Sequence, residues 1–146
     1  MPKKDTVKKV MLFGTFDGLH PGHLDFFKQA RSIAGDNAFL IVSIARDKNV
    51  FKIKNHTPHL NEKARMALLR KCELVDKVVL SGARDHLPHI IKEKPDIIAL
   101  GYDQTHYVAN LQKDLRNNGL KVQVKRLLPY KAHIYKNNLL RKKNTR

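Results

Sequence analysis

The apolar residues of the chain form short runs that alternate with longer segments of helical spacing. Five runs rich in β-branched residues predict strands over residues 10–13, 39–45, 77–81, 96–100 and 121–127. Four segments with apolar residues every three or four positions predict helices over residues 23–34, 61–73, 85–94 and 106–118. Several runs are apolar at successive positions, which is typical of strands that are buried on both faces.

This alternation predicts a single α/β domain over residues 1–146. Short strand-to-helix connections favour right-handed crossovers, and hence a Rossmann-like, doubly wound parallel sheet of five strands in the order 3-2-1-4-5, with helices on both faces. Gly35 and Gly119 are expected to end the first and fourth helices, and Asn61 is expected to cap the second. Ligands of such sheets bind beyond the carboxyl ends of the strands, where the strand order reverses.

Three loops at that edge of the predicted sheet are rich in glycine, histidine, lysine and aspartate. They read GTFDGLHPGH (14–23), RDKNVFKIKNHTPH (46–59) and GYDQTH (101–106). In the second loop Lys52 and Lys54 alternate with apolar residues. We therefore expect an extended segment there, with one lysine directed to the site and the other to solvent.

The composition, 42% hydrophobic and 29% charged, is that of a folded soluble protein. Most of the formal charge of +16 lies at the ends, in residues 1–9 and 125–146, where Asp5 is the sole acid. We interpret residues 1–8 and 142–146 as flexible basic ends that promote solubility. No apolar run reaches the roughly 20 residues that span a bilayer, and the N-terminus lacks the apolar segment of a signal peptide, so we expect a cytoplasmic protein without a membrane partner.

The stretch FGTFDGLHPGHL (13–24) is the densest candidate site. It is not a Walker A sequence, because no Gly-Lys-Ser/Thr follows, and its glycines are four residues apart rather than in the dinucleotide-binding pattern. A strand end, small residues and a helix start nevertheless form an arrangement that binds anions. Two roles stay open for Asp17: a cap of the turn or a catalytic group.

The His-x-x-His spacing occurs three times in the chain, at residues 20 and 23, 56 and 59, and 86 and 89. Spacing alone is therefore not diagnostic, and only the pair His20 and His23 coincides with a strand end and a glycine-rich turn. A structural zinc site is disfavoured because no cysteine is nearby. We expect His86 and His89 to be surface residues at the opposite end of the sheet.

GTFDGLHPGH closely resembles the signature of the nucleotidyltransferases with the HxGH motif, which include glycerol-3-phosphate cytidylyltransferase, pantetheine-phosphate adenylyltransferase and archaeal-type FAD synthetases. The resemblance extends over nearly the whole chain. RDKNVFKIKNHTPHLNEKAR (46–65) is similar to the second block of the family, and Lys54 and Arg65 match its basic positions. KPDIIALGYDQT (94–105) resembles a block of the FAD synthetases in which Asp103 would contact the nucleotide.

The end of the chain, PYKAHIYKNNLLRK (129–142), resembles the final phosphate-binding block. Tyr130 takes the position of a nucleotide-contacting tyrosine there, whereas Asn137 and Asn138 replace the usual Ser or Thr pairs. Asparagine can still cap a helix start that faces phosphate.

The resemblance implies direct transfer, in which a phosphate oxygen of the acceptor attacks the α-phosphate of a nucleoside triphosphate and pyrophosphate leaves. The candidate catalytic residues are His20, His23 and Lys54; Lys54, Arg65 and Arg141 would offset phosphate charge. The candidate nucleotide-binding residues are Gly14, Thr15, Phe16, Asp17, Pro21, Gly22, Arg65, Gly101, Asp103, Tyr130, Asn137, Asn138 and Arg141. No metal-binding residue is assigned, because the resemblance implies Mg²⁺ held mainly by the triphosphate.

We expect an FMN adenylyltransferase that uses ATP, because LGYDQT (100–105) resembles the FAD synthetases. The alternative is a cytidylyltransferase that uses CTP and glycerol 3-phosphate or a related alcohol phosphate. A second alternative is an inactive nucleotide fold that binds nucleic acid through its basic residues. The intact histidine motif and the lack of a run of exposed aromatic residues for base stacking argue against that module. A homodimer is compatible with the resemblance.

Overall fold

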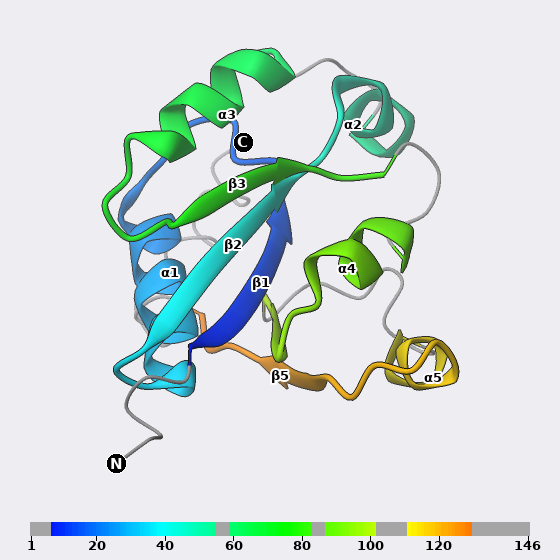
Figure 1. Cartoon of the computed structure of the whole chain (residues 1–146). Coiled ribbons are helices and arrows are strands. Elements are labelled where there is room, and N and C mark those ends of the chain that lie inside the picture. The colour runs from blue at the N-terminus through cyan, green and yellow to red at the C-terminus, as the bar shows by residue number, and fades with distance from the viewer. Residues whose placement is uncertain (1–6, 55–58, 83–86, 102–110, 130–146) are drawn as a thin grey trace.

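The computed structural model describes residues 7–54, 59–82, 87–101 and 111–129, with the side chains of residues 51–54 left out. Its five parallel strands form one sheet in the order β3-β2-β1-β4-β5 (Figure 1). The strands are β1 (Lys8–Gly14), β2 (Ala38–Ile44), β3 (Lys77–Leu80), β4 (Ile97–Leu100) and β5 (Gln123–Arg126). The predicted fold class and strand order are confirmed.

Helices cover both faces of the sheet (Figure 1). They are α1 (Pro21–Ala34), α2 (Asp47–Lys54), α3 (Glu62–Arg70), α4 (Leu87–Glu93) and α5 (Leu111–Asn117). Helices α1 and α3 lie on one face, α4 and α5 lie on the other, and α2 lies beyond the carboxyl end of β2 (Figure 1). None of the helices in the described ranges is both long and apolar enough to cross a membrane.

The core has two layers because successive side chains of a strand point to opposite faces. Val10 and Leu12 of β1 pack in the cluster that contains Phe27 of α1. Met11, which lies between them, packs in the cluster that contains Ile90 of α4. All five side chains are fully buried, so the central strand is apolar on both faces, as its sequence predicted.

Several element ends carry the predicted signals. Gly35 and Gly119 follow α1 and α5 with φ angles of 90° and 82°, in the region that favours glycine. The Asn61 side chain accepts a hydrogen bond from Ala64 N at 2.8 Å and caps α3. Lys8, placed by the sequence in a flexible end, begins β1; residues 1–6 and 142–146 lie outside the described residues.

The expectation of an extended segment around Lys52 and Lys54 was wrong, because residues 47–54 form α2. Asp47 N donates to the Glu62 carboxylate at 2.9 Å, and Glu62 N donates to the Asp47 carboxylate at 3.1 Å. These reciprocal bonds satisfy main-chain donors in the first turns of α2 and α3. The helix start is thus stabilised by a residue 15 positions away, which a local pattern does not reveal.

The expectation that His89 is a surface residue at the opposite end of the sheet was also wrong. His89 is partly buried on α4, and its Nε2 lies 2.9 Å from the Ser43 hydroxyl of β2. Its ring also meets the ring of Phe13 edge to face, with 5.9 Å between the centroids. His89 therefore joins α4 to the sheet, whereas His86 lies outside the described residues.

Candidate functional site

The loop between β1 and α1 lies at the carboxyl end of the central strand. Strands β2 and β3 lie on one side of β1, and β4 and β5 lie on the other. The strand order therefore reverses beside this loop, and the candidate site is where doubly wound sheets bind ligands.

The start of this loop is strained and tightly packed. Phe16 has a φ angle of 54°, which is unusual for a bulky residue, and such a conformation costs about 1–3 kcal/mol. Packing holds it in place: its side chain is buried, and its ring lies 5.5 Å from that of Phe27. A Cβ at Gly14 would lie 2.7 Å from the Phe16 ring, so glycine is required there. The loop is thus fixed by the core.

His20 and His23 form a capping box at the start of α1. Nδ1 of His20, the N-cap residue, accepts a hydrogen bond from Gly22 N at 3.0 Å. Nδ1 of His23 accepts one from His20 N at 3.3 Å. Pro21 begins the helix, a position that needs no N–H donor. Two imidazoles thus take the places that Ser or Thr and Glu or Gln usually occupy.

This arrangement decides which ring nitrogens can bind a ligand. Because each Nδ1 of His20 and His23 accepts a main-chain hydrogen bond, a neutral ring carries its proton on Nε2. The rings are stacked, with 3.7 Å between their centroids and 26° between their planes. Two Nε2–H donors therefore lie together at the amino end of a helix, where the helix dipole also favours anions.

Burial lowers the pKa of His23 from 6.5 to about 4, and the neighbouring His20 contributes to the lowering. His23 is therefore neutral at physiological pH in the unliganded protein. A neutral imidazole still donates from Nε2, and a bound anion would favour its protonation.

The shifted pKa of His23 predicts a pH-dependent stability. Between its unfolded pKa of 6.5 and its folded pKa of about 4, the unfolded chain holds a proton that the folded chain lacks. The folded state is therefore not penalised for its neutral His23 above pH 6.5, and the protein loses stability as the pH falls from 6.5 to about 4. Urea unfolding at neutral pH and at a pH of about 4.5 should therefore show a smaller loss of stability in His23→Gln than in the wild type. An equal loss in both proteins would contradict the assignment.

Arg65, a predicted phosphate contact, supports the framework of the site. Its side chain is fully buried. Nε donates to the Leu60 carbonyl at 3.1 Å, Nη1 donates to the Thr15 carbonyl at 2.9 Å, and Nη2 donates to Asp47 at 2.6 Å. Arg65 thereby joins the β1–α1 loop to the starts of α2 and α3, and its contact with phosphate stays a prediction.

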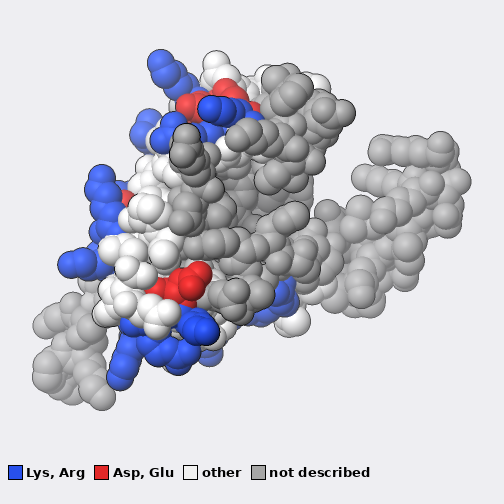
Figure 2. Space-filling view, turned by 90° about the vertical axis from the view of Figure 1, so that its right-hand side faces the viewer, with Lys and Arg blue, Asp and Glu red and all other residues white. Residues whose placement is uncertain are grey.

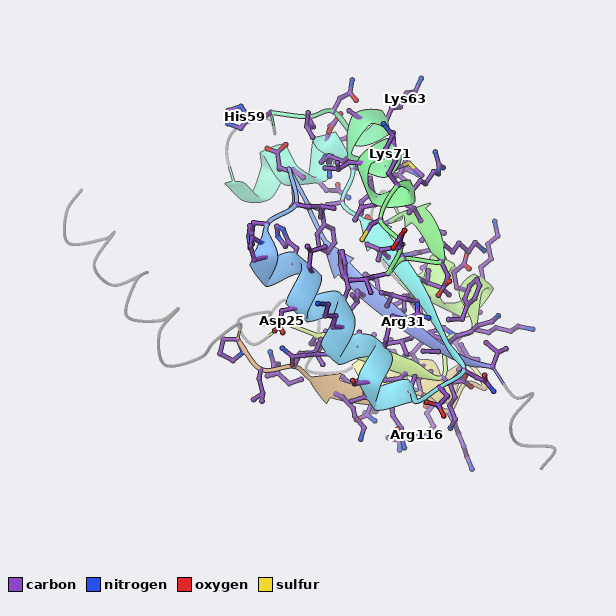
Figure 3. The ribbon with its side chains drawn as sticks, turned by 90° about the vertical axis from the view of Figure 1, so that its left-hand side faces the viewer. Asp25, Arg31, His59, Lys63, Lys71 and Arg116 are labelled. Carbon is purple, nitrogen blue, oxygen red and sulfur yellow. The ribbon has the colours of Figure 1, made fainter. Side chains whose placement is uncertain are left out.

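The Asp17 carboxylate binds main-chain N–H groups of another segment, the one that precedes α3. Its carboxylate accepts hydrogen bonds from His59 N at 2.6 Å and from Leu60 N at 2.7 Å. The hydrogen bond from Leu60 is the main cause that holds the pKa of Asp17 below its ordinary value. The cap thus belongs to the segment before α3 and not to the turn that contains Asp17. In Figure 3, His59 lies near the end at which α1 begins, whereas Arg31 lies near the other end of that helix.

The structure brings all the predicted residues of the first motif together between the end of β1 and the start of α1. These are Gly14, Thr15, Phe16, Asp17, His20, Pro21, Gly22 and His23. Gly101 directly follows β4, and its carbonyl accepts a hydrogen bond from Arg126 at 2.8 Å. Lys54 is the last residue of α2. The side chain of Lys54 and residues Asp103, Tyr130, Asn137, Asn138 and Arg141 lie outside the described residues.

Carboxylates at the site are already engaged. The oxygens of Asp17 accept main-chain hydrogen bonds, and those of Asp47 bind Arg65 and Glu62 N. Within the described ranges, no three His, Cys, Asp or Glu side chains form a group that could hold a metal ion. These residues therefore offer no cage for a divalent cation.

A cavity of about 440 Å³ lies at the opposite end of the sheet, beside the amino ends of β4 and β5. Its polar lining includes Lys8, Asp96, Arg116 and Lys121. Figure 3 shows Arg116 far from His59, and Figure 2 shows Lys and Arg side chains near the base of the face that carries α4 and α5. This cavity is separate from the histidine pair.

Comparison with known proteins agrees with this geometry. Residues 11–143 match the family described as cytidylyltransferase-like. A FAD synthase of Korarchaeum cryptofilum is 43% identical over 120 residues, which cover 82% of this chain and 81% of that protein. A FAD synthase of Methanothermobacter marburgensis is 39% identical over 129 residues, which cover 88% and 80%.

A solved structure has the same fold over nearly its whole length. The lipopolysaccharide core biosynthesis protein from Thermoplasma volcanium superposes with a TM-score of 0.77 at 34% identity, covering 86% of this chain and 99% of that one. The family match covers most of the sheet, the loop between β1 and α1 that leads to His20 and His23 (the histidine loop), and most of residues 129–146. The chain therefore belongs to the cytidylyltransferase-like family of nucleotidyltransferases.

Proposed function

We propose that the protein is an FMN adenylyltransferase, which joins the AMP part of ATP to FMN and releases pyrophosphate. The stacked pair His20 and His23, with two Nε2–H donors at a helix start, carries the proposal of nucleotidyl transfer. The choice of ATP and FMN is supported by relatives named FAD synthase that are about 40% identical over most of their length.

The reaction requires no covalent intermediate on the protein. An oxygen of the FMN phosphate forms a bond to the α-phosphorus of ATP, and the bond from that phosphorus to the bridging oxygen of the β-phosphate breaks. The bridging oxygen leaves with the electron pair as part of pyrophosphate. A phosphate monoester is largely dianionic at neutral pH, so no base is needed to activate the nucleophile.

The chain contributes placement and charge stabilisation. Nε2–H of His20 and His23 would donate to the α-phosphate and to the bridging oxygen as negative charge grows there. Lys54 and Arg141 would offset the charge of the phosphates, with Arg65 as a further contact. Gly101, Asp103, Tyr130, Asn137 and Asn138 would complete the nucleotide pocket.

Mg²⁺ bound to the triphosphate would lower the negative charge that the acceptor phosphate must approach. At the site, the carboxylates of Asp17 and Asp47 are engaged with main-chain donors and Arg65, so they do not fit as its ligands. We therefore assign no protein ligand to the ion.

Pyrophosphate release tests the proposal. The full chain is incubated with Mg²⁺ and four pairs of substrates, which combine ATP or CTP with FMN or glycerol 3-phosphate. We expect release with ATP and FMN together, with FAD as the second product. Release only with CTP and glycerol 3-phosphate would replace the proposal by a cytidylyltransferase. If no pair releases pyrophosphate and the protein instead binds nucleic acid in a salt-sensitive way, the proposal that it is an enzyme is wrong.

A further inference from the structure

Arg46 differs from the other shielded arginines of the structure. Among the described residues, Arg31, Arg46 and Arg65 are the arginines that are at least partly buried. Arg31 pairs with Asp76 at 2.6 Å, and Arg65 pairs with Asp47 at 2.6 Å. Arg46 forms no ion pair with the described carboxylates. Fully buried charges are almost always paired, and a partly shielded cation such as Arg46 also gains from an anionic partner.

One edge of the Arg46 guanidinium is fixed by the protein. Nε donates to the carbonyl of Ser81 at 2.7 Å, and Ser81 directly follows β3. Nη1 and Nη2 form no hydrogen bond within the described part of the chain. The side chain is therefore oriented, and two of its donor nitrogens are not used by any described residue. A guanidinium in this state suits the oxygens of a phosphate, which it can bind through two parallel hydrogen bonds.

The main chain at Arg46 lies next to the histidine loop. Ala45 N donates to the Gly14 carbonyl at 2.9 Å, so the residue before Arg46 is bonded to the residue from which that loop leaves β1. Adjacent strands lie about 4.8 Å apart, which brings the carboxyl end of β2 next to the loop. Gly101 directly follows β4, which lies on the other side of β1 from β2 and β3. Arg46 and Gly101 thus lie on opposite sides of the β1–α1 loop, and we assign the side of Arg46 to the acceptor.

We propose that Arg46 binds the phosphate of the acceptor and thereby selects phosphorylated acceptors, an inference that rests on the proposed FMN adenylyltransferase. The guanidinium holds one or two non-attacking oxygens of the FMN phosphate. An oxygen that the guanidinium does not hold is then directed toward the α-phosphate at the histidine pair. Arg46 contributes no contact to ATP.

FMN and riboflavin test this role directly, because they differ only in the phosphate. Binding to the full chain is followed by quenching of flavin fluorescence. The wild type should bind FMN more tightly than riboflavin. Arg46→Gln should weaken FMN binding about 10- to 100-fold and leave riboflavin binding unchanged. In turnover, the KM for FMN should rise while the KM for ATP stays the same.

Asn49→Ala is the matched control. Asn49 Nδ2 donates to the Gly82 carbonyl at 3.2 Å, so Asn49 makes a similar tether to the end of β3 without a cation. This variant should keep the preference for FMN over riboflavin. If Arg46→Gln weakens both flavins equally, or neither, Arg46 is only a tether and the inference is overturned.

The outcome is separable from that of the proposed function. If the wild type does not turn over FMN but turns over CTP and glycerol 3-phosphate, the proposed function is wrong. The role of Arg46 is then tested with glycerol 3-phosphate as the acceptor. Arg46→Gln should then raise the KM for glycerol 3-phosphate and leave the KM for CTP unchanged, and an unchanged KM for both overturns the inference. A wild type without turnover of either phosphorylated acceptor overturns both proposals.

Discussion

Replacing His20 with asparagine, or His23 with glutamine, should lower kcat about a hundredfold without unfolding the protein. Each substitution removes one Nε2–H donor of the stacked pair. Loss of one donor to a developing oxyanion typically costs on the order of 3 kcal/mol of transition-state stabilisation. Because the donors act on charge that grows during the reaction, KM should change much less than kcat.

The substitutions are chosen to keep the start of α1 intact. Asparagine is a favourable N-cap residue, and glutamine at the third helical position can accept the hydrogen bond from the N-cap N–H, as in an ordinary capping box. His20→Ala lacks the cap and should in addition lose about 1 kcal/mol of stability. Steady-state rates and thermal unfolding, measured on the same samples, separate catalysis from capping.

His59→Asn is the matched control for these variants. His59 is exposed, and its hydrogen bond to Asp17 is made by the main-chain N–H, which the substitution keeps. This variant should turn over at nearly the wild-type rate. Full turnover in both His20→Asn and His23→Gln would refute the role assigned to the histidine pair.

Arg65→Met should lower the free energy of unfolding by about 3 kcal/mol or more. The substitution removes the donors that Arg65 supplies to one oxygen of the Asp47 carboxylate and to the carbonyls of Thr15 and Leu60. For a chain of this length, such a loss lowers Tm on the order of 10 °C. Chemical and thermal unfolding measure it, with activity expressed per folded molecule.

Arg70→Met provides the comparison on the same helix. Arg70 is exposed in the last turn of α3, so its loss should change stability by less than about 0.5 kcal/mol. If Arg65→Met is as stable as Arg70→Met, the structural role of Arg65 is wrong. A raised KM for ATP in the folded Arg65→Met protein would add the predicted phosphate contact to the structural role.

The order of the elements other than α2 was predictable because the residues at their ends carry local signals. Apolar runs such as residues 10–13 and 96–100 are buried strands, and Gly35, Asn61 and Gly119 end or begin helices as expected. The position of the HPGH segment was equally predictable, since it follows the strand beside which the strand order reverses.

The interactions that hold the site were not predictable from local pattern. Helix α2 begins at Asp47 because Glu62, on another element, accepts from its N–H. Two of the acceptors around Arg65, Thr15 and Asp47, come from segments that meet it only in the folded chain, so local pattern did not reveal its structural role; its contact with phosphate stays a prediction. His89 likewise looked exposed because its partner Ser43 lies 46 positions earlier, on β2.

The reciprocal bonds between Asp47 and Glu62 also affect how the protein can diverge. They hold the two ends of the intervening stretch against each other, independently of what lies between. Lengthening a closed loop costs little, about 0.6 kcal/mol for each doubling. A longer connection between α2 and His59 should therefore cost little stability and leave the histidine pair in place, which makes this connection a natural segment to exchange when substrate preference is to be changed.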